Sequence, residues 1–320
     1  MDGKLLVILN PVAGKGRARA ERPVIEDTFR TFGLPFELRE TEATGHATVL
    51  AANAFDRGFS LVVAAGGDGT CNEVINGLME SARERGTAPV LGVIPVGRGN
   101  DFGYGAGIPS DPSSALQILR SGRAQSLDLG RIVGGDYPQG RYFGNGVGIG
   151  FDTIVGLEAS RNRFFHGALS YVYGALRTLV IYPEAPDLRV SYNGTERSLR
   201  SPQISIMNGR RMGGTFFMAP DAEVSDGLLD LCMAVRPLRR GEMVRLMVRY
   251  MKGTQAQSDV IETDRVPRFH VDAPRGGLVC HVDGETICTD GKSLEVECVE
   301  SALRMIRCSE PRLYHDSSRR

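Results

Sequence analysis

The sequence predicts an α/β fold with an N-terminal, mostly parallel α/β nucleotide-binding domain and a C-terminal β-rich sandwich domain. Over residues 1–123, short apolar runs alternate with helical patterns, which is typical of a parallel sheet with helices on both faces. Over residues 124–292, many short strand-like runs are separated by turn residues such as Gly134-Gly135-Asp136. Runs of this second kind favour antiparallel strands in a sandwich or barrel.

The expected elements follow from these patterns. In the first part we predict strands over 4–10, 35–40, 61–65 and 90–95, and helices over 17–30, 46–57, 70–78 and 113–120. In the second part we predict strands over 125–133, 141–150, 188–192, 203–208, 228–235, 268–271 and 278–282, with helical inserts over 151–181 and 241–252. Residues 293–306 fit two strands or a strand and a helix, and the segment 293–308 can pack back on the first domain. Residues 309–320 are polar and are expected to form a flexible tail.

Composition excludes several classes of protein. The 320 residues carry 38 basic and 38 acidic side chains, which argues against nucleic-acid binding through overall charge. Six cysteines form no Cys-x-x-Cys pair, so a zinc site is not expected. No apolar run approaches the roughly 20 residues that span a bilayer. We therefore expect a cytoplasmic protein that meets lipid peripherally, at the membrane surface, and a homodimer is compatible with the sequence.

One stretch organises the chain. An apolar run over 61–65 leads into Gly66-Gly67-Asp68-Gly69-Thr70 and then into a helical pattern, in which Thr70 and Glu73 have the spacing of a capping box. Glycines allow a phosphate to approach the backbone, and a helix N-terminus offers free N–H groups. A carboxylate beside a phosphate requires a cation between them, so we interpret Asp68 as a Mg²⁺ ligand. The alternative is a structural turn with a capping aspartate.

Two further glycine-bearing turns follow predicted strands. Asn10-Pro11-x-x-Gly14 follows the first strand, and Gly97-Arg98-Gly99-Asn100-Asp101-Phe102 follows the strand that ends at Pro95. Ligands of parallel sheets bind outside the carboxyl ends of the strands. The three turns can therefore converge on one ligand.

In this order and spacing, the three motifs resemble the diacylglycerol kinase catalytic-domain family, which includes bacterial soluble lipid kinases, sphingosine kinases and ceramide kinases. The resemblance continues in Ser225-Asp226-Gly227-Leu228-Leu229-Asp230 and His281-Val282-Asp283-Gly284-Glu285. The Gly-Gly-Asp-Gly-Thr motif alone also resembles NAD kinases and phosphofructokinases.

The resemblance implies an active site in a cleft between a nucleotide domain and a lipid domain, with ATP and Mg²⁺ as cofactors. The implied nucleotide contacts are Asn10, Pro11, Gly14, Thr41, Gly66, Gly67, Asp68, Gly69, Thr70, Glu73, Gly97, Arg98, Gly99, Asn100 and Asp101. Two Mg²⁺ sites are implied: an ATP-bound one near Asp68, Asp101 and Asp128, and a structural one at Asp226 with backbone carbonyls near Glu223 and Leu228. The implied catalytic residues are Asp68, Asp283 and Glu285.

Each of these interpretations has a plainer alternative. Asp283-Gly284 and Asp226-Gly227 are also strong turn signals. Arg98 stands where relatives commonly have threonine, so that contact is lost or replaced by the guanidinium. The basic, apolar segment 236–252 reads as a helix that lies on anionic membrane or simply covers a sheet.

The resulting functional prediction is an ATP-dependent lipid kinase. It transfers the γ-phosphate to a lipid hydroxyl, with diacylglycerol giving phosphatidic acid as the first candidate and a sphingoid base or another glycerolipid as further ones. The alternatives are a kinase for a soluble acceptor such as NAD, and a nucleotide-binding regulator without catalysis.

Overall fold

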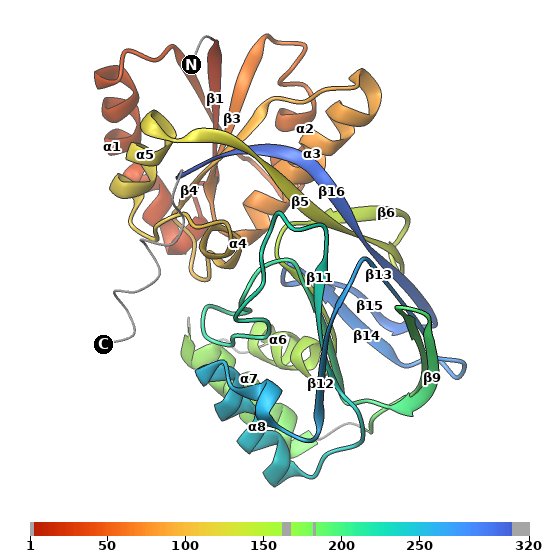
Figure 1. Ribbon diagram of the computed structural model, residues 1–320. Coiled ribbons are helices and arrows are strands. Elements are labelled where there is room, and N and C mark those ends of the chain that lie inside the picture. The colour runs from red at the N-terminus through yellow and green to blue at the C-terminus, as the bar shows by residue number, and fades with distance from the viewer. Residues whose placement is uncertain (1–2, 162–167, 182–183, 309–320) are drawn as a thin grey trace. The chain divides into compact units, whose positions relative to one another are not determined.

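The computed structural model describes residues 3–161, 168–181 and 184–308 (Figure 1). These residues fall into two compact units. The first comprises the chain up to Leu129 and from Glu300 on, and the second comprises Gly130–Val299. The chain passes from one unit to the other within two strands, β5 (Arg123–Gly134) and β16 (Ser293–Arg307).

The first unit is built on four parallel strands in the order β2-β1-β3-β4. Their bounds are β1 (Lys4–Leu9), β2 (Phe36–Glu40), β3 (Phe59–Gly66) and β4 (Val90–Pro95). The two central strands, β1 and β3, are almost continuously apolar and buried, as expected for parallel strands that are covered on both faces. Met305 of β16 continues this sheet beside Leu91 of β4, again in parallel.

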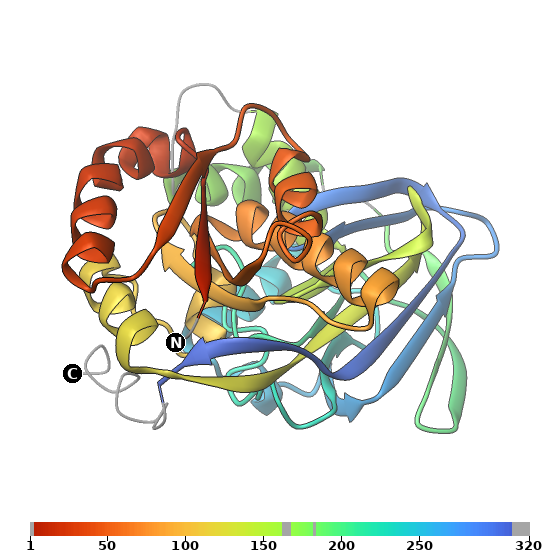
Figure 2. The same ribbon diagram turned by 90° about the horizontal axis from the view of Figure 1, so that it is seen from above.

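Helices cover both faces of this sheet. They are η1 (Ala13–Gly16), α1 (Arg17–Thr31), α2 (His46–Ala52), α3 (Asp68–Arg85), α4 (Asp101–Gly105) and α5 (Pro112–Ser121). Helices α1 and α5 lie on one side and α2 and α3 on the other (Figure 2). Local signals explain some ends: Asp111 caps α5 by accepting the Ser114 N–H, and Gly86 in a left-handed conformation ends α3.

The predicted capping box of α3 is wrong. The helix begins at Asp68, and its N-cap residue, Gly67, has no side chain to form a cap. Thr70 Oγ1 instead accepts a hydrogen bond from Asn10 Nδ2 at 3.1 Å, and Glu73 Oε2 accepts one from the Ala47 backbone N–H at 3.1 Å. Both side chains therefore join α3 to neighbouring segments, because tertiary partners displaced the local one.

The second unit is a β-sandwich. Its six-stranded sheet, β12-β11-β10-β7-β14-β15, is antiparallel throughout, and its other sheet contains β13, β8, β9 and the first part of β16, with β5 and β6 alongside. The remaining bounds are β6 (Tyr137–Phe143), β7 (Gly146–Gly150), β8 (Asp187–Tyr192), β9 (Thr195–Arg200), β10 (Gln203–Met207), β11 (Leu229–Ala234), β12 (Ile261–Val266), β13 (Arg268–Asp272), β14 (Leu278–Val282) and β15 (Glu285–Gly291). Phe143, Phe269 and aliphatic side chains from both sheets fill the core between them.

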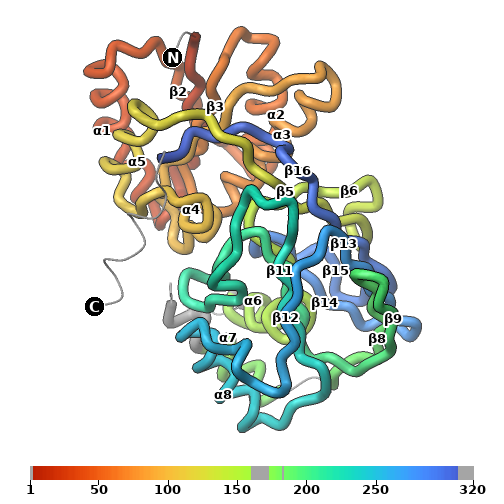
Figure 3. The backbone as a smooth tube through the Cα atoms, viewed as in Figure 1, coloured from red at the N-terminus to blue at the C-terminus, as the bar shows by residue number. Residues whose placement is uncertain are grey.

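Three helices cover the other face of the six-stranded sheet: α6 (Phe151–Arg161), α7 (Ala168–Ile181) and α8 (Arg240–Lys252), with the short η2 (Gln255–Gln257) after α8 (Figure 3). Met243, Leu246 and Tyr250 of α8 are buried against Met207 and Cys232 of the sheet. Helix α8 therefore covers a sheet, which is one of the two interpretations that the sequence supports for the segment 236–252.

Several boundaries differ from the predicted ones. The strand predicted over 141–150 is two strands, β6 and β7, joined by the Gly144–Asn145 turn. The segment over 293–306 is a single strand, β16, rather than two elements, although Ser301 within it has a φ of 49°. Strands β9, β12 and β15 were missed, because their exposed faces carry too few apolar residues to show a strand pattern.

We predict that Gly77→Ala destabilises the first unit. Gly77 lies where α3 meets α2, and an added Cβ would stand 2.3 Å from the Thr48 carbonyl oxygen and 2.8 Å from Ala51 Cβ. We expect a loss of about 1–3 kcal/mol, as for other overpacked sites, measured by denaturant unfolding. The control is Gly156→Ala in α6, where the methyl meets no atom within 4 Å. An unchanged unfolding midpoint for Gly77→Ala would contradict this packing.

Candidate functional site

The three glycine-bearing turns meet at the carboxyl ends of β1, β3 and β4. The Asn10 backbone N–H donates to the Ala65 carbonyl at 3.0 Å, and the N–H groups of Val96 and Gly97 donate to Gly66 O at 3.0 and 3.1 Å. The strand ends are thus tied to one another immediately before each turn. The structure therefore brings together the three predicted turns, at residues 10–14, 66–70 and 97–101.

The turns approach so closely that only glycine fits. A Cβ on Gly97 would lie 2.3 Å from Gly67 Cα, and a Cβ on Gly14 would lie 2.3 Å from the Val96 carbonyl oxygen. Gly14 also has a φ of 59°, which favours glycine. Asn100 fixes the third turn through its side chain, whose Oδ1 accepts the Gly97 N–H at 3.0 Å. The result is a floor made of backbone atoms next to the N-terminus of α3.

Two carboxylates lie close to Gly99, beside this floor. Asp68 Oδ1 accepts the Phe102 N–H at 3.0 Å, while Asp68 Oδ2 and Asp101 Oδ2 would lie 2.8 and 3.3 Å from a Cβ placed on Gly99. Burial raises the pKa of Asp68 above its usual value, against the opposing effect of backbone hydrogen bonds from Phe102 and its neighbours. Two carboxylate oxygens so close to one point favour a shared cation.

The donor set fits Mg²⁺ only together with a phosphate ligand. Among the residues described, no group of three or more His, Cys, Asp or Glu side chains could hold a metal ion by itself. Mg²⁺ usually binds through one or two carboxylates, water and substrate phosphates, and Asp68 and Asp101 meet that requirement. Asp128, which the resemblance also implied, is buried, and its Oδ1 accepts the Ser301 N–H at 2.7 Å.

The second implied Mg²⁺ site has a different arrangement. Asp226 Oδ1 accepts the Leu228 N–H at 3.0 Å, and its other carboxylate oxygen pairs with Arg265. The arginine already compensates the carboxylate charge. A Mg²⁺ ion held by Asp226 and by carbonyls near Glu223 and Leu228 would have to compete with that guanidinium.

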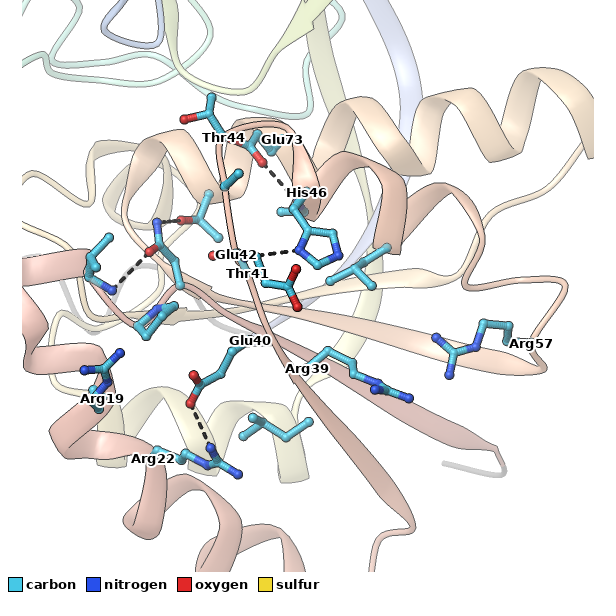
Figure 4. A pocket seen from close by; sticks show the side chains of 18 residues that line it. Arg19, Arg22, Arg39, Glu40, Thr41, Glu42, Thr44, His46, Arg57 and Glu73 are labelled. Carbon is cyan, nitrogen blue, oxygen red and sulfur yellow. Dashed lines mark hydrogen bonds and ion pairs between the residues drawn. The ribbon is translucent and has the colours of Figure 1, made fainter.

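A cavity of about 1060 Å³ opens beside the glycine floor in the first unit (Figure 4). Five of the implied nucleotide contacts line it, namely Asn10, Pro11, Thr41, Thr70 and Glu73. The hydrogen bond between Asn10 and Thr70 lies where the cavity reaches the turns. The volume is comparable to that of the largest small-molecule and cofactor pockets.

Charged residues surround the cavity, and Figure 4 labels four arginines and three glutamates there. Arg22 binds Glu40 at 2.8 Å, and Arg39 and Arg57 each bind Glu37 at 2.7 Å. Arg19 has no ion pair among the residues described and is exposed. Sequence reasoning missed Arg19, because nothing distinguishes it from the other arginines of α1. Arg98 is likewise exposed on its turn.

The two candidate catalytic carboxylates of the second unit have different surroundings. Asp283 and Gly284, with φ of 47° and 86°, form the two-residue turn of the β14–β15 hairpin. The Asp283 carboxylate accepts the backbone N–H groups of Gly144, Asn145 and Gly146 at 2.8–3.1 Å. The turn interpretation is therefore right about the backbone, and Asp283 also holds the β6–β7 turn in place.

Glu285 starts β15 and remains half exposed. Its Oε1 accepts the Tyr137 hydroxyl at 3.0 Å, and its Oε2 binds Arg141 at 2.6 Å. Arg141 also donates to the Tyr137 hydroxyl at 2.8 Å. Burial and the hydrogen bond with Glu285 raise the pKa of Tyr137, so the phenol keeps its proton and orients the carboxylate.

Two protein families match this chain, one over its N-terminal part and one over its C-terminal part. The family described as "Diacylglycerol kinase catalytic domain" matches residues 4–132, and the one described as "YegS C-terminal NAD kinase beta sandwich-like domain" matches residues 145–307. A protein of Mycobacterium tuberculosis named diacylglycerol kinase is 32% identical over 308 residues, which are 95% of each chain.

The chain belongs to the diacylglycerol kinase catalytic-domain family. A Xanthomonas oryzae protein named probable lipid kinase YegS-like is 31% identical over 93% of this chain and 94% of that one. A crystal structure of a diacylglycerol kinase from Bacillus anthracis shares the fold, with a TM-score of 0.71 and 19% identity over 97% of this chain and 98% of that one.

For this diacylglycerol kinase family member, the predicted family, the fold class and the enzyme class of lipid kinase are confirmed. The catalytic, nucleotide and metal assignments of single residues stay predictions. Among the described helices, none is long and apolar enough to cross a membrane.

The second unit also contains a buried polar cluster that sequence reasoning missed. Gly148 of β7 pairs with Ser205 on one side and His281 on the other, and a Cβ there would lie 2.3 Å from Asp152 Oδ2 and 2.4 Å from His281 Nε2. Burial raises the pKa of Asp152 to about 7 and lowers that of His281 to about 4. The only sequence signal was glycine at position 148 in a buried strand. His281 is packed, as a strand histidine usually is.

We predict that Asp152→Asn changes how stability depends on pH. An acid whose folded pKa is raised costs stability as pH rises from its unfolded value, near 4, to about 7. The asparagine variant does not lose stability in this way. Its free energy of unfolding should therefore exceed that of the parent by an amount that grows across this interval to roughly 2–4 kcal/mol, at about 1.4 kcal/mol per pKa unit. Thermal melting between pH 4 and 8 measures it. A constant difference between the two proteins would show that Asp152 does not titrate as described.

Proposed function

We propose that this family member transfers the γ-phosphate of ATP to a lipid hydroxyl, with diacylglycerol as the first candidate acceptor and phosphatidic acid as its product. The observation that supports it most is the convergence of three glycine turns on a backbone floor, next to a nucleotide-sized cavity and two carboxylates. The names of the relatives support a lipid acceptor. We expect that acceptor to be reached at a membrane surface.

The proposed nucleotide site follows the floor. The base and ribose lie in the cavity near Thr41, and the phosphates lie over Gly66, Gly67 and the α3 N-terminus, where backbone N–H groups and the helix dipole stabilise negative charge. Asn10 orients Thr70 at the junction of these two parts. Arg19 at the cavity and Arg98 on the third turn are exposed cations that can meet phosphate oxygens.

Asp68 and Asp101 are the residues that would hold a nucleotide-bound Mg²⁺. When bound, the ion neutralises charge that develops on the phosphate oxygens. Phosphoryl transfer otherwise requires positioning rather than covalent chemistry from the protein. The chain meets that requirement by holding Asp68 through the Phe102 N–H, which keeps the carboxylate next to Gly99 and Asp101.

We assign Glu285 as the residue that receives the proton of the acceptor hydroxyl. Its side chain is exposed, and Arg141 and Tyr137 fix both carboxylate oxygens without covering them. The hydroxyl oxygen attacks the γ-phosphorus, the bond to ADP breaks, and the proton passes to Glu285. Asp283 is occupied by three backbone donors, so its role is to position the turn that carries Glu285.

One assay separates the candidate functions. Purified protein, MgATP labelled in the γ-phosphate and one acceptor at a time are incubated with dispersed diacylglycerol, sphingosine, NAD or no acceptor. Our proposal predicts label in phosphatidic acid. Label only in NADP would favour the soluble-acceptor kinase. ATP binding without transfer to any acceptor would favour the regulator.

We predict that Glu285→Gln lowers kcat by at least about 100-fold, the usual contribution of general-base catalysis, while the Kd for ATP changes little. The matched control is Glu297→Gln, because Glu297 also lies on a strand of the second unit and pairs with Arg131 at 3.0 Å. Asp283→Asn should impair activity together with thermal stability, since it weakens the anchor of the β6–β7 turn. Near-normal turnover by Glu285→Gln would remove Glu285 from the mechanism.

A further inference from the structure

The last turns of helix α7 expose several large apolar side chains. Leu176, Val180 and Ile181 are 60%, 69% and 49% exposed, whereas Gly174, Ala175 and Thr178 are buried and Leu179 packs partly against the core. A Cβ on Gly174 would lie 2.4 Å from the Val155 carbonyl oxygen of α6. The contact with α6 therefore depends on close backbone approach. It leaves these three aliphatic side chains in water, which is the reverse of an ordinary surface helix.

Helix α8 extends the same surface. Its buried face, with Met243, Leu246 and Tyr250, already packs on the sheet, yet Val244, Val248 and Met251 are 46%, 45% and 51% exposed. The two helices are neighbours: Arg240 of α8 donates to the Val180 carbonyl of α7 at 3.1 Å, and Figures 1 and 3 show them next to each other. We call the exposed apolar residues of these two helices the α7–α8 surface.

Basic residues border the α7–α8 surface. Helix α8 carries Arg240, Arg245, Arg249 and Lys252, and its only acidic residue is Glu242. Glu242 is occupied by Arg236 at 2.8 Å and by the Arg239 N–H at 2.7 Å, so it does not neutralise the later arginines. Apolar groups flanked by basic side chains are typical of helices that lie on anionic lipid.

We propose that the α7–α8 surface docks on the headgroup region of an anionic bilayer. The aliphatic side chains enter the acyl boundary, and the arginines and the lysine contact lipid phosphates. This inference rests on the proposed function in one respect, that the acceptor is a membrane lipid. Both helices lie parallel to the surface on docking, and neither crosses it.

Charge favours a bilayer over a second copy of the chain. In a twofold dimer the same patch meets itself, which would bring the α8 cations of one protomer against those of the other. An anionic bilayer offers each cation a phosphate and each aliphatic group an acyl environment. Other exposed apolar residues, such as Val24 and Val49, lie singly on helices of the first unit and need no partner.

Vesicle binding tests this without using catalysis. The full chain, without ATP, is sedimented with vesicles of phosphatidylcholine alone or mixed with phosphatidylglycerol. We expect binding to the mixed vesicles only. Arg245→Glu should lower the partition coefficient at least about fivefold, given the usual contribution of one basic residue at an anionic surface. Val180→Gln with Val248→Gln should lower it at least as much.

Matched controls come from exposed positions of the first unit. Val49→Gln and Arg83→Glu change the same residue types on exposed helical faces and should leave binding unchanged. Phosphorylation of a short-chain diacylglycerol, in solution as monomers, should be unaffected in the α7–α8 variants. A protein that binds mixed vesicles but phosphorylates no lipid would refute the proposed function and leave the docking surface standing.

Three results would overturn the docking surface. The first is no binding of the parent protein to mixed vesicles. The second is equal loss of binding in the Val49 and Arg83 controls. The third is a parent dimer, seen by light scattering without vesicles, that Val180→Gln with Val248→Gln converts to a monomer, because the surface would then join two copies of the chain.

Discussion

Backbone contact between Gly67 and Gly97 is the constraint on which the rest of the site depends. A single methyl group on Gly97 would overlap Gly67 Cα, so the turn after β4 can approach the turn after β3 this closely only with glycine at position 97. The same turn brings Gly99 next to the carboxylates of Asp68 and Asp101. The same strand ends place Asn10 against Thr70 and so connect the floor to the cavity. We propose that this backbone floor binds the phosphates. A floor of this kind is preorganised before any ligand binds, which is what phosphoryl transfer requires.

In the second unit, one carboxylate holds the backbone in place and a nearby one is exposed. Both carboxylate oxygens of Asp283 accept hydrogen bonds from the backbone of the β6–β7 turn. Glu285, two residues later, is half exposed between Tyr137 and Arg141. The Asp-Gly-Glu motif therefore combines a turn that fixes its own position with a carboxylate that is oriented but accessible. Helices α7 and α8 follow a similar logic, because each uses one face for packing and keeps apolar groups on the other.

Much of the first unit could be predicted from the sequence, because its signals are local. Val90–Pro95 is a largely buried apolar run that follows Pro89 and leads into the glycine turn from Gly97, and its predicted limits match β4. The glycine turns were predictable for the same reason. The capping box at Thr70 and Glu73 was not, since both side chains bind partners far away in the chain, Asn10 and Ala47. Pattern alone does not show such tertiary competition.

The second unit was harder to predict. Strand β9 (Thr195–Arg200) has exposed charged residues along most of its length, so only its hairpin partner β8 carries a strand pattern. The surroundings of Arg19 and Asp152 are formed by residues that are distant in the sequence. No residue spacing in the sequence predicts these contacts. Leu176 and Val180 look like core residues in the sequence. In the described part of α7, Gly174, Ala175 and Thr178 face the protein instead, and Leu176 and Val180 are left exposed.

The most direct test is a crystal structure of the chain with Mg²⁺ and a non-hydrolysable ATP analogue. Our account predicts the base in the cavity near Thr41, the phosphates on the backbone of residues 66–70 and 97–99, and the metal between phosphate oxygens and Asp68. A triphosphate bound away from these turns, or a metal that contacts neither Asp68 nor Asp101, would contradict this account.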